Sequence, residues 1–547
     1  MSRPPAIGLL LSLAIYLGLA ATTLQEVGIV GEVAIAGWLK EPPTVELEPT
    51  DSGERRWGPL VARRTRPTES LEVGGFSLPL TVNAYTGGLS DWPVRLAVAL
   101  FGQGAAVPTT VGLGALLIVL AHRFLRFHGS DAAPTAAALL LATDWAFLYY
   151  RKALGGTEVL LQASFLLVLW ALWSRRWKGG RHGTVAIALG VGLGLQAKLT
   201  FVATVLAFGL SILLSRWDRQ ALRPPEPIRR IWLLLLPLLC VAPLLIAHIH
   251  HLFLDAPLLR SHDAAGLQLQ RLWAGLSGGT QDRESLDNLL YFFGNPLAFF
   301  GAAYGAEAQP PLSILRLCSF AAVLGGVGLA WLRPQQSPAD ALLRFLSMFL
   351  PIQLGILLLL NRDMHHLGQM SVGLALLGAL GADRLAGQFA PRGMVRRILA
   401  VFLLFPAMVA GVGQLWRSDG VLATIPVPTF TRSGQENLQH MLEKANVQRL
   451  YVADYESYGL LELLQPELPI TQLWPAVAGG RRGPAILEQA RGAHLLVLRA
   501  SAPMIYNWNP SPRVLEKEAR SIGIPVERVD SLRCGDQECA WLWKVGP

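Results

Sequence analysis

Long apolar runs recur along most of this chain, and they limit how it can fold more than any other feature. They cover residues 7–23, 106–121, 132–149, 157–173, 184–197, 199–214, 231–249, 312–331, 345–360, 367–383 and 398–414. Each run is close to the roughly 20 residues that an α-helix needs to cross a bilayer. Because 52% of the residues are hydrophobic and only 16% are charged, the core of a soluble domain does not account for them. The sequence predicts a polytopic α-helical membrane protein with about eleven transmembrane helices.

The first run, residues 7–23, can also be interpreted as a secretory signal peptide. Arg3 precedes its apolar core, and Ala20 and Ala21 follow it. Its apolar stretch is as long as the other runs, however, and further hydrophobic runs follow along the chain. We therefore expect a retained first transmembrane helix.

Basic residues indicate how the helices are oriented. With a cytoplasmic N-terminus, the cytoplasmic loops are HRFLRFHGS, SRRWKGGRHG, SRWDRQALRPPEPIRR, WLRPQQSPADALLR and DRLAGQFAPRGMVRR, and each holds several Lys or Arg residues. This pattern follows the positive-inside rule, and we expect a bacterial inner membrane protein. Residues 24–105, residues 250–311 and everything after residue 415 then lie outside. The net charge of +9 reflects the loops, so we do not expect nucleic-acid binding.

The end of the chain is predicted to be a small soluble, extracytoplasmic α/β domain over residues 431–547. Strand-like runs RLYVADY, HLLVLRA, IPVERV and AWLWKV alternate with helical stretches ENLQHMLEKA, PAILEQARGA and PRVLEKEARSIG. Such alternation is typical of a compact α/β sheet domain. We expect a transmembrane domain over residues 1–415 and a linker over residues 416–430. The C-terminal domain lacks a Gly-rich phosphate loop, so we interpret it as an accessory or acceptor-side domain.

Two cysteines lie close together in this C-terminal region, in the stretch RCGDQECAW. Cys534 and Cys539 are near enough to form a disulfide around a small loop, which an exported domain allows. A metal-binding pair is the alternative, but no other Cys or His lies nearby to complete a site.

Several charged residues stand at the outer ends of the predicted helices. Glu26 follows the first apolar run, and Glu32 lies six residues further on. A carboxylate at either position is functional or is simply solvated beyond the end of the helix. Arg151 and Lys152 follow the third run and can be phosphate ligands or interfacial anchors. Lys198 interrupts a long apolar stretch, where a charge needs a partner or a ligand. Glu158 and Asp91 are more typical of helix starts.

At these residues the sequence resembles the GT-C superfamily of integral-membrane glycosyltransferases. It is most similar to the family 39 type, which includes protein mannosyltransferases and lipid A aminoarabinose transferases. The matching features occur in the family's order: Gln25-Glu26 at the end of the first helix, then Pro79, Tyr85, Gly87, Phe101 and Gly102, then Arg151, and finally Lys198 at the break of a Gly-rich helix. The resemblance covers the transmembrane part and says little about the C-terminal domain.

The resemblance implies the transfer of a sugar from a polyprenyl-phosphate donor to an extracytoplasmic acceptor in cell-envelope glycan synthesis. Glu26 is the candidate general base and Glu32 the second choice. Cations implied for the donor phosphate are Arg151, Lys152, Lys198, Arg362 and His366. Tyr85 is implied in the substrate cavity. The acceptor can be a protein, a lipid or a glycan.

One departure from the family pattern concerns the acidic pair after the first helix. The family's Asp is replaced by Gln25, so Glu26 either works alone or the chain is a non-catalytic GT-C-shaped subunit that binds other membrane proteins. A transporter is the third alternative, but we find no internal repeat of the kind that transporters show. The lipid-linked sugar is the only donor that we expect, and no cofactor or metal is predicted, although other branches of the superfamily use a divalent ion.

Two further motifs have ordinary interpretations. Gly190, Gly192 and Gly194 lie inside an apolar run and follow no strand, so we expect close helix packing and not a dinucleotide loop. His248, His250 and His251 lie where a membrane helix ends, a position that favours amphipathic side chains over a zinc site.

Overall fold

The computed structural model describes most of the helical part and most of the C-terminal domain. The described residues are 5–25, 70–73, 76–79, 81–83, 86–128, 132–153, 156–178, 183–214, 235–242, 310–333, 337–360, 368–390, 393–424, 431–452, 461, 465, 468–472, 482–498, 511–534 and 537–547. All structural statements below concern these residues.

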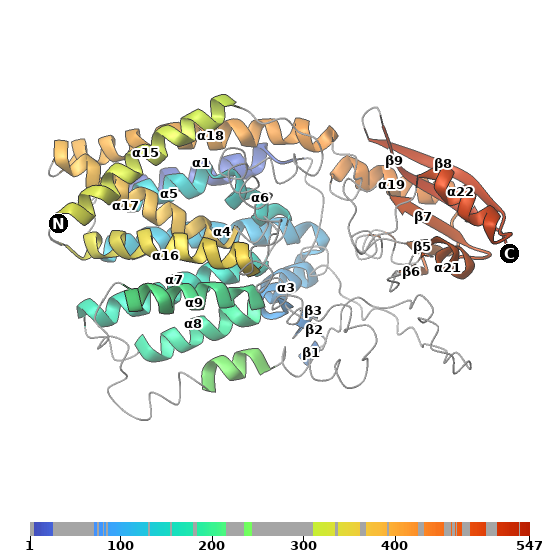
Figure 1. The fold of residues 1–547 in the computed structure, drawn as a ribbon, viewed down its shortest axis with the longest axis horizontal. Helices are drawn as coiled ribbons and strands as arrows, with labels where there is room; N and C mark the ends of the chain where they lie inside the picture. The colour runs from blue at the N-terminus through green and yellow to red at the C-terminus, as the bar shows by residue number, and fades with distance from the viewer. Residues whose placement is uncertain are drawn as a thin grey trace.

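The apolar runs form a bundle of helices that lie side by side (Figure 1). Its helices are α1 (Pro5–Thr22), α4 (Ala106–Phe127), α5 (Ala133–Thr143), α6 (Trp145–Ala153), α7 (Gly156–Lys178), α8 (Gly183–Ala197), α9 (Val202–Leu214), α15 (Pro310–Leu332), α16 (Pro338–Leu360), α17 (Ser371–Phe389) and α18 (Met394–Thr424). Among the described residues, 6 helices are long and apolar enough to cross a membrane, and α1, α5, α8 and α9 fall among the shorter apolar helices. The prediction of a polytopic helical membrane protein is confirmed.

The outer surface of the bundle is apolar, unlike that of a soluble protein. Large hydrophobic side chains such as Leu317, Phe320, Phe402 and Phe405 are exposed on α15 and α18. A bilayer covers such a surface, and all backbone polar groups of a helix are satisfied within it.

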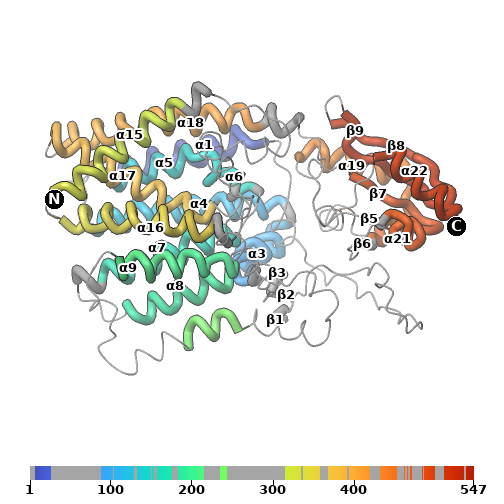
Figure 2. The backbone as a smooth tube through the Cα atoms, in the orientation of Figure 1, coloured from blue at the N-terminus to red at the C-terminus, as the bar shows by residue number. Residues whose placement is uncertain are grey.

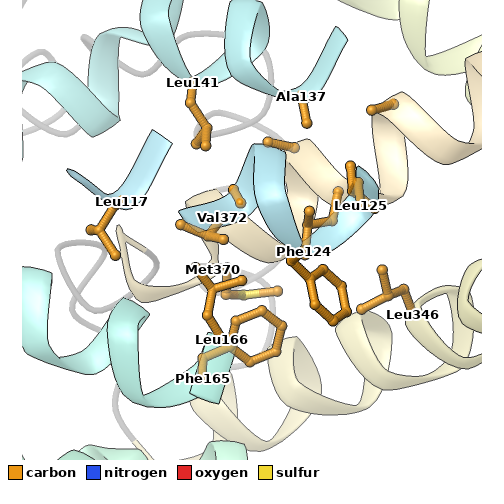
Figure 3. Close-up of a cluster of buried hydrophobic side chains, with 14 of the residues drawn as sticks. Leu117, Phe124, Leu125, Ala137, Leu141, Phe165, Leu166, Leu346, Met370 and Val372 are labelled. Carbon is orange, nitrogen blue, oxygen red and sulfur yellow. The ribbon is translucent and has the colours of Figure 1, made fainter. Parts of the chain in front are cut away.

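The interior packs large side chains from several helices, and the Ala-rich helix α5 lies against α1, α4, α17 and α18. Figure 3 shows one part of this core, where Leu117 and Phe124 of α4, Phe165 of α7, and Leu346 of α16 meet beside Met370. Small residues let neighbouring helices approach closely. A Cβ added at Gly411 of α18, for example, would collide with the carbonyl oxygen of Thr143 at the end of α5.

The third predicted span, residues 132–149, is broken into two helices at Asp144. Asp144 is extended (φ −75°, ψ 120°) after α5, and its Oδ1 accepts a hydrogen bond of 2.6 Å from the backbone N–H of Phe147 in α6. This carboxylate therefore caps a new helix, and the apolar pattern alone did not reveal the break.

The glycines of α8 serve helix packing, as predicted. A Cβ at Gly190 would lie 2.8 Å from Val168 of α7, and one at Gly192 would lie 2.9 Å from the Cys240 side chain. A Cβ at Gly194 would overlap the ring of Phe201, which follows the end of α8. The structure thus uses these glycines for close approach between helices.

The last helix of the bundle is longer than its apolar run. α18 continues to Thr424, through part of the predicted linker over residues 416–430. Trp416 is exposed on it, whereas Ser418 is buried and donates through its hydroxyl to the carbonyl of Leu415. A helix keeps its backbone hydrogen bonds where its hydropathy falls, so α18 is longer than the apolar run over residues 398–414.

A small set of elements lies between α1 and α4 in the sequence. It comprises β1 (Ser70–Val73), β2 (Phe76–Pro79), β3 (Thr81–Asn83), β4 (Thr86–Gly87), the 3-10 helix η1 (Leu89–Asp91), α3 (Trp92–Phe101) and the 3-10 helix η2 (Gln103–Ala105). β1 pairs antiparallel with β2, and β3 with β4. Asp91 precedes α3 as predicted, with Pro93 in its first turn, although the Asp91 side chain makes no capping bond.

The C-terminal region forms a mixed five-stranded sheet, shown at the red end of the tube in Figure 2. Its elements are α19 (Arg432–Lys444), β5 (Leu450–Val452), β6 (Ile470–Gln472), α21 (Arg482–Gln489), β7 (His494–Leu498), α22 (Pro512–Ser521), β8 (Val526–Cys534) and β9 (Gln537–Val545). The strand order is β6-β5-β7-β9-β8, with β5 parallel to both neighbours and β9 antiparallel to both of its own. The four predicted strands are present, and the short edge strand β6 was not predicted.

The sheet buries apolar side chains on both faces. Trp541, Trp543 and Val545 of β9 pack with α21 and α22 on one face, while Ala540 and Leu542 pack with α19 on the other. Cys534 of β8 and Cys539 of β9 form a disulfide, with their Cα atoms 5.7 Å apart. It joins the two strands of the terminal hairpin, where the sequence predicted a small closed loop.

Candidate functional site

Polar and charged side chains are buried together where α6 ends and α7 begins. We refer to this set as the polar cluster. Its members are Ser90, Arg151, Lys152, Thr157, Glu158 and Gln162, and Lys198 is also buried, at the end of α8. The cluster stands out because buried charges and amides are costly inside a membrane protein and usually serve a ligand or a partner.

Arg151 is the most deeply buried cation of the cluster, with an exposed fraction of 0%. Its Nη2 donates a hydrogen bond of 2.6 Å to Oε1 of Gln162. Nε and Nη1 have no hydrogen-bond partner among the described residues. A guanidinium carries five N–H donors in a rigid fork, so Arg151 retains donors on two nitrogens for an anion.

Packing around the Arg151 side chain fixes where it lies. Its guanidinium carbon is 4.8 Å from the centre of the Phe147 ring, a cation–π arrangement. The hydroxyl of Thr110 in α4 donates to the Arg151 carbonyl. Gly114, one turn further along α4, leaves space for the side chain, since a Cβ there would lie 3.0 Å from Arg151 Cγ.

Tyr16 of α1 completes this surrounding. Its ring centre is 5.9 Å from that of Phe147, and its hydroxyl donates to the carbonyl of Val111 at 3.2 Å. A Cβ at Gly114 would also collide with the Tyr16 hydroxyl. Helices α1, α4 and α6 therefore enclose one side of Arg151.

Gln162 connects Arg151 to another part of the bundle. Its Nε2 donates a hydrogen bond of 2.7 Å to the carbonyl of Gly368, just before α17. Gln162 is fully buried. The chain Arg151, Gln162, Gly368 thus joins α6, α7 and the start of α17 through side-chain hydrogen bonds.

Lys152 contacts a different element from its neighbour. Its Nζ donates to the carbonyl oxygens of Thr23 at 2.6 Å and Leu24 at 3.1 Å, just past the end of α1. Leu24 has a left-handed backbone, with φ of 56°, as is common where a helix ends. A cation at a helix C-terminus satisfies carbonyls that otherwise lack a donor and is stabilised by the helix dipole. Lys152 therefore holds the end of α1.

The residue after Leu24 is Gln25, where the sequence resemblance implies an Asp. Gln25 is exposed, and its Nε2 donates to the carbonyl of Ala21 within α1. A carboxylate cannot donate such a bond. In this chain Gln25 therefore helps to close the last turn of α1.

Lys198 lies where α8 ends. It has an extended backbone (φ −160°, ψ 132°) and precedes the short helix η3 (Leu199–Phe201). Its side chain is only 5% exposed. The break of the Gly-rich helix at Lys198 agrees with the resemblance described above.

Other members connect the cluster to η1. Ser90 Oγ and Thr157 Oγ1 are hydrogen-bonded at 3.1 Å, and η1 contacts both α7 and α8. Glu158, in the first turn of α7 as predicted, interacts electrostatically with Arg151. Through η1, the region of Arg151 and the end of α8 belong to the same end of the bundle.

Five predicted site residues lie outside the described residues. They are Glu26, Glu32, Tyr85, Arg362 and His366. The histidines of residues 248–251 lie outside as well. Within the described ranges, no three His, Cys, Asp or Glu side chains gather in a way that could hold a metal ion.

Sequence reasoning missed Gln162, Tyr16 and Gly114. Gln162 had a usable signal, because it is an amide inside the apolar run of residues 157–173, where a polar side chain needs a partner. Gly114 had none, since its importance comes from Tyr16 and Arg151, which approach from two other helices.

Comparison with solved structures identifies the fold. ArnT from Cupriavidus metallidurans bound to undecaprenyl phosphate matches with a TM-score of 0.56 at 11% sequence identity, over 97% of both chains. Apo ArnT matches with a TM-score of 0.43 at 12% identity, over 98% of this chain and 97% of that one. The apo Archaeoglobus fulgidus oligosaccharyltransferase matches with a TM-score of 0.49 at 13% identity, over 96% of this chain and 69% of that one. No protein-family model and no curated protein matches the chain. The chain has an ArnT-like fold at low sequence identity.

Proposed function

We propose that this chain is a membrane glycosyltransferase that moves a sugar from a polyprenyl-phosphate donor to an extracytoplasmic acceptor. The observation that carries the proposal is Arg151, a fully buried guanidinium with two nitrogens that have no hydrogen-bond partner among the described residues. The chain that carries Arg151 has the fold of ArnT, which was solved with undecaprenyl phosphate.

A buried guanidinium with unsatisfied N–H donors is costly, because those donors have lost their hydrogen bonds to water. A phosphate group offsets that cost, since its oxygens accept short, charge-assisted hydrogen bonds from arginine. Cation–π contact with Phe147 and the electrostatic interaction with Glu158 compensate the charge without occupying Nε and Nη1. The surroundings of Arg151 therefore favour an anionic ligand.

The fold and the membrane setting support a polyprenyl-phosphate donor. ArnT was solved with undecaprenyl phosphate and shares its fold with this chain over 97% of both lengths. A polyprenyl tail requires apolar surroundings, which the lipid-facing helices provide. A phosphate at Arg151 then lies at the end of the bundle that we expect to face outward.

The reaction is a displacement at the anomeric carbon of the sugar. We assign Glu26 as the general base that takes the proton of the acceptor hydroxyl, with Glu32 as second choice. The hydroxyl oxygen bonds to the anomeric carbon as the bond from that carbon to the phosphate oxygen breaks, with inversion. Arg151 and Lys198 stabilise the negative charge on the departing polyprenyl phosphate. Arg362 and His366 are assigned to the same phosphate, and Tyr85 to the substrate cavity.

A second candidate is a non-catalytic subunit with the same fold. Gln25 favours it, because this residue replaces the family's Asp and bonds to α1 instead of offering a carboxylate. The two candidates differ in whether Glu26 is needed for transfer.

The experiment is a transfer assay with purified protein in vesicles, using undecaprenyl-phosphate-linked monosaccharides with a labelled sugar and acceptors from a cell-envelope extract. We expect the wild type to release undecaprenyl phosphate, and Glu26→Gln and Arg151→Met each to reduce the rate at least about 100-fold. Arg344→Met, which removes a half-buried arginine that donates to the carbonyl of Ala330, serves as control. Transfer by Glu26→Gln at the wild-type rate refutes the base assignment, and the absence of transfer by the wild type favours the non-catalytic subunit.

A further inference from the structure

We propose that Gln162 is a positioning residue that presents the Arg151 guanidinium to the lipid phosphate. This inference rests on the proposed function, because it concerns how that phosphate is bound. Gln162 is fully buried between two partners. It accepts from Arg151 Nη2 at 2.6 Å and donates to the Gly368 carbonyl at 2.7 Å.

The two partners fix the orientation of the Gln162 amide. The carbonyl of Gly368 can only accept a hydrogen bond, so it selects the NH₂ group of the amide. The amide oxygen must then point to the other side, where Arg151 Nη2 donates to it. A glutamate cannot donate to Gly368, and a methionine can do neither. Only an amide of this length satisfies both partners.

This arrangement engages Arg151 at one nitrogen and leaves the rest of the fork available. Gln162 bonds Nη2, while Nε and Nη1 lack partners among the described residues. The Phe147 ring, with its centre 4.8 Å from the guanidinium carbon, offers no hydrogen-bond acceptor atom of its own. Because the amide is neutral, it orients the cation without cancelling the charge that attracts phosphate.

Preorganisation explains why such a connection matters. A long arginine side chain loses rotamer freedom when it binds a ligand, and that loss weakens binding. Contacts with Gln162, Phe147 and Gly114 already restrict the Arg151 side chain to one position before the ligand binds. Gln162 therefore strengthens binding of the phosphate group through Arg151, without itself contacting the lipid tail.

The test compares affinities for undecaprenyl phosphate and undecaprenol, measured by native mass spectrometry of the full chain in nanodiscs of zwitterionic lipid. The ratio of the two affinities isolates the phosphate contribution, which a general loss of structure does not change selectively. We expect Gln162→Met to reduce this ratio about tenfold or more. Gln162→Glu should reduce it further, because its carboxylate pairs with Arg151.

A matched control exists elsewhere in the bundle. Arg316 Nη2 donates to Oε1 of the buried Gln414 in the same kind of pair. Gln414→Met removes the same type of bond, and we expect its affinity ratio to stay within about twofold of the wild type. A ratio that falls equally in Gln414→Met overturns the specific role of Gln162.

A double-mutant cycle with Arg151→Met completes the test. If Gln162 acts through Arg151, then Gln162→Met has no further effect on the ratio in the Arg151→Met background. An unchanged ratio in Gln162→Met, with the wild type still preferring the phosphate, refutes this inference and leaves the proposed function standing. A wild type that shows no preference for phosphate over alcohol refutes the proposed function itself. Should Gln162→Met not fold, Gln162→Leu, which also removes both hydrogen bonds without adding a charge, provides the same comparison.

Discussion

Gly114 of α4 offers a direct test of how tightly the Arg151 site is packed. A Cβ at this position would collide with the hydroxyl of Tyr16 and lie 3.0 Å from Cγ and 3.1 Å from Cδ of Arg151. Tyr16 and Arg151 both have exposed fractions of 0%, so neither side chain can turn into solvent to avoid the added carbon. Gly114→Ala should therefore shift Tyr16, Arg151 or the spacing of α1 and α4.

The size of the effect follows from two opposing contributions. Overpacking of a well-packed core by an added carbon costs about 1–3 kcal/mol, whereas replacing Gly by Ala inside a helix gains about 1 kcal/mol. Gly112 lies on the same helix with nothing within 4 Å of an added Cβ. Gly112→Ala obtains the helix gain alone, so the difference between the two variants reports the overpacking, about 1–3 kcal/mol.

The assay is thermal unfolding of both variants in detergent, followed by undecaprenyl phosphate binding at a temperature where both are folded. We expect Gly114→Ala to be less stable than Gly112→Ala and to bind the phosphate lipid at least about tenfold more weakly, because Arg151 is displaced. If Gly114→Ala matches Gly112→Ala in both stability and binding, the enclosure of Arg151 by α1, α4 and α6 is wrong.

Three further predictions concern other contacts. Lys152→Met leaves the carbonyls of Thr23 and Leu24 without their donor, and it should destabilise the chain by about 1–3 kcal/mol in thermal unfolding; an unchanged melting temperature contradicts the assignment of Lys152 to the end of α1. Gly411→Ala places a Cβ against the backbone carbonyl of Thr143, so it should lower the melting temperature more than Gly355→Ala, where nothing lies within 4 Å; equal melting temperatures refute this close packing. Hydrogen bonds from Lys444 and Trp541 respectively lower the pKa of Asp530 and the pKa of Glu538 below their ordinary values. The unfolded state then binds more protons, so this contribution to stability is complete above about pH 5 and is lost as the pH falls through the folded pKa values. Hydrogen-exchange protection of β8 and β9 in the full chain, corrected for intrinsic rates, should therefore fall from pH 6 to pH 3. The fall should be smaller in Lys444→Met, and protection that does not change with pH contradicts the stabilising role of these two carboxylates.

The helical architecture was predictable because bilayer-spanning helices need long apolar runs, and those runs are visible in one sequence. The break at Asp144 was not predictable from hydropathy, since a single carboxylate caps α6 through a local bond to Phe147. The edge strand β6 was missed because its three residues, Ile470–Gln472, are too few to show an alternating pattern.

The candidate site was predictable only in part. Arg151 and Lys152 are adjacent cations, and the sequence gives no reason to assign them different roles. The structure separates them through partners far away in the chain, with Arg151 on Gln162 and Lys152 on Thr23 and Leu24. Such tertiary partners depend on how α1, α6 and α7 pack, which local patterns do not contain.

The central claim is that Arg151 receives the phosphate of a polyprenyl carrier. The most direct measurement is an experimental structure of the wild-type chain in nanodiscs with undecaprenyl phosphate. We predict a phosphate oxygen about 2.7–2.9 Å from Nε or Nη1 of Arg151, with Nη2 still bonded to Gln162. A phosphate bound away from Arg151, or another group occupying Nε and Nη1, would contradict it.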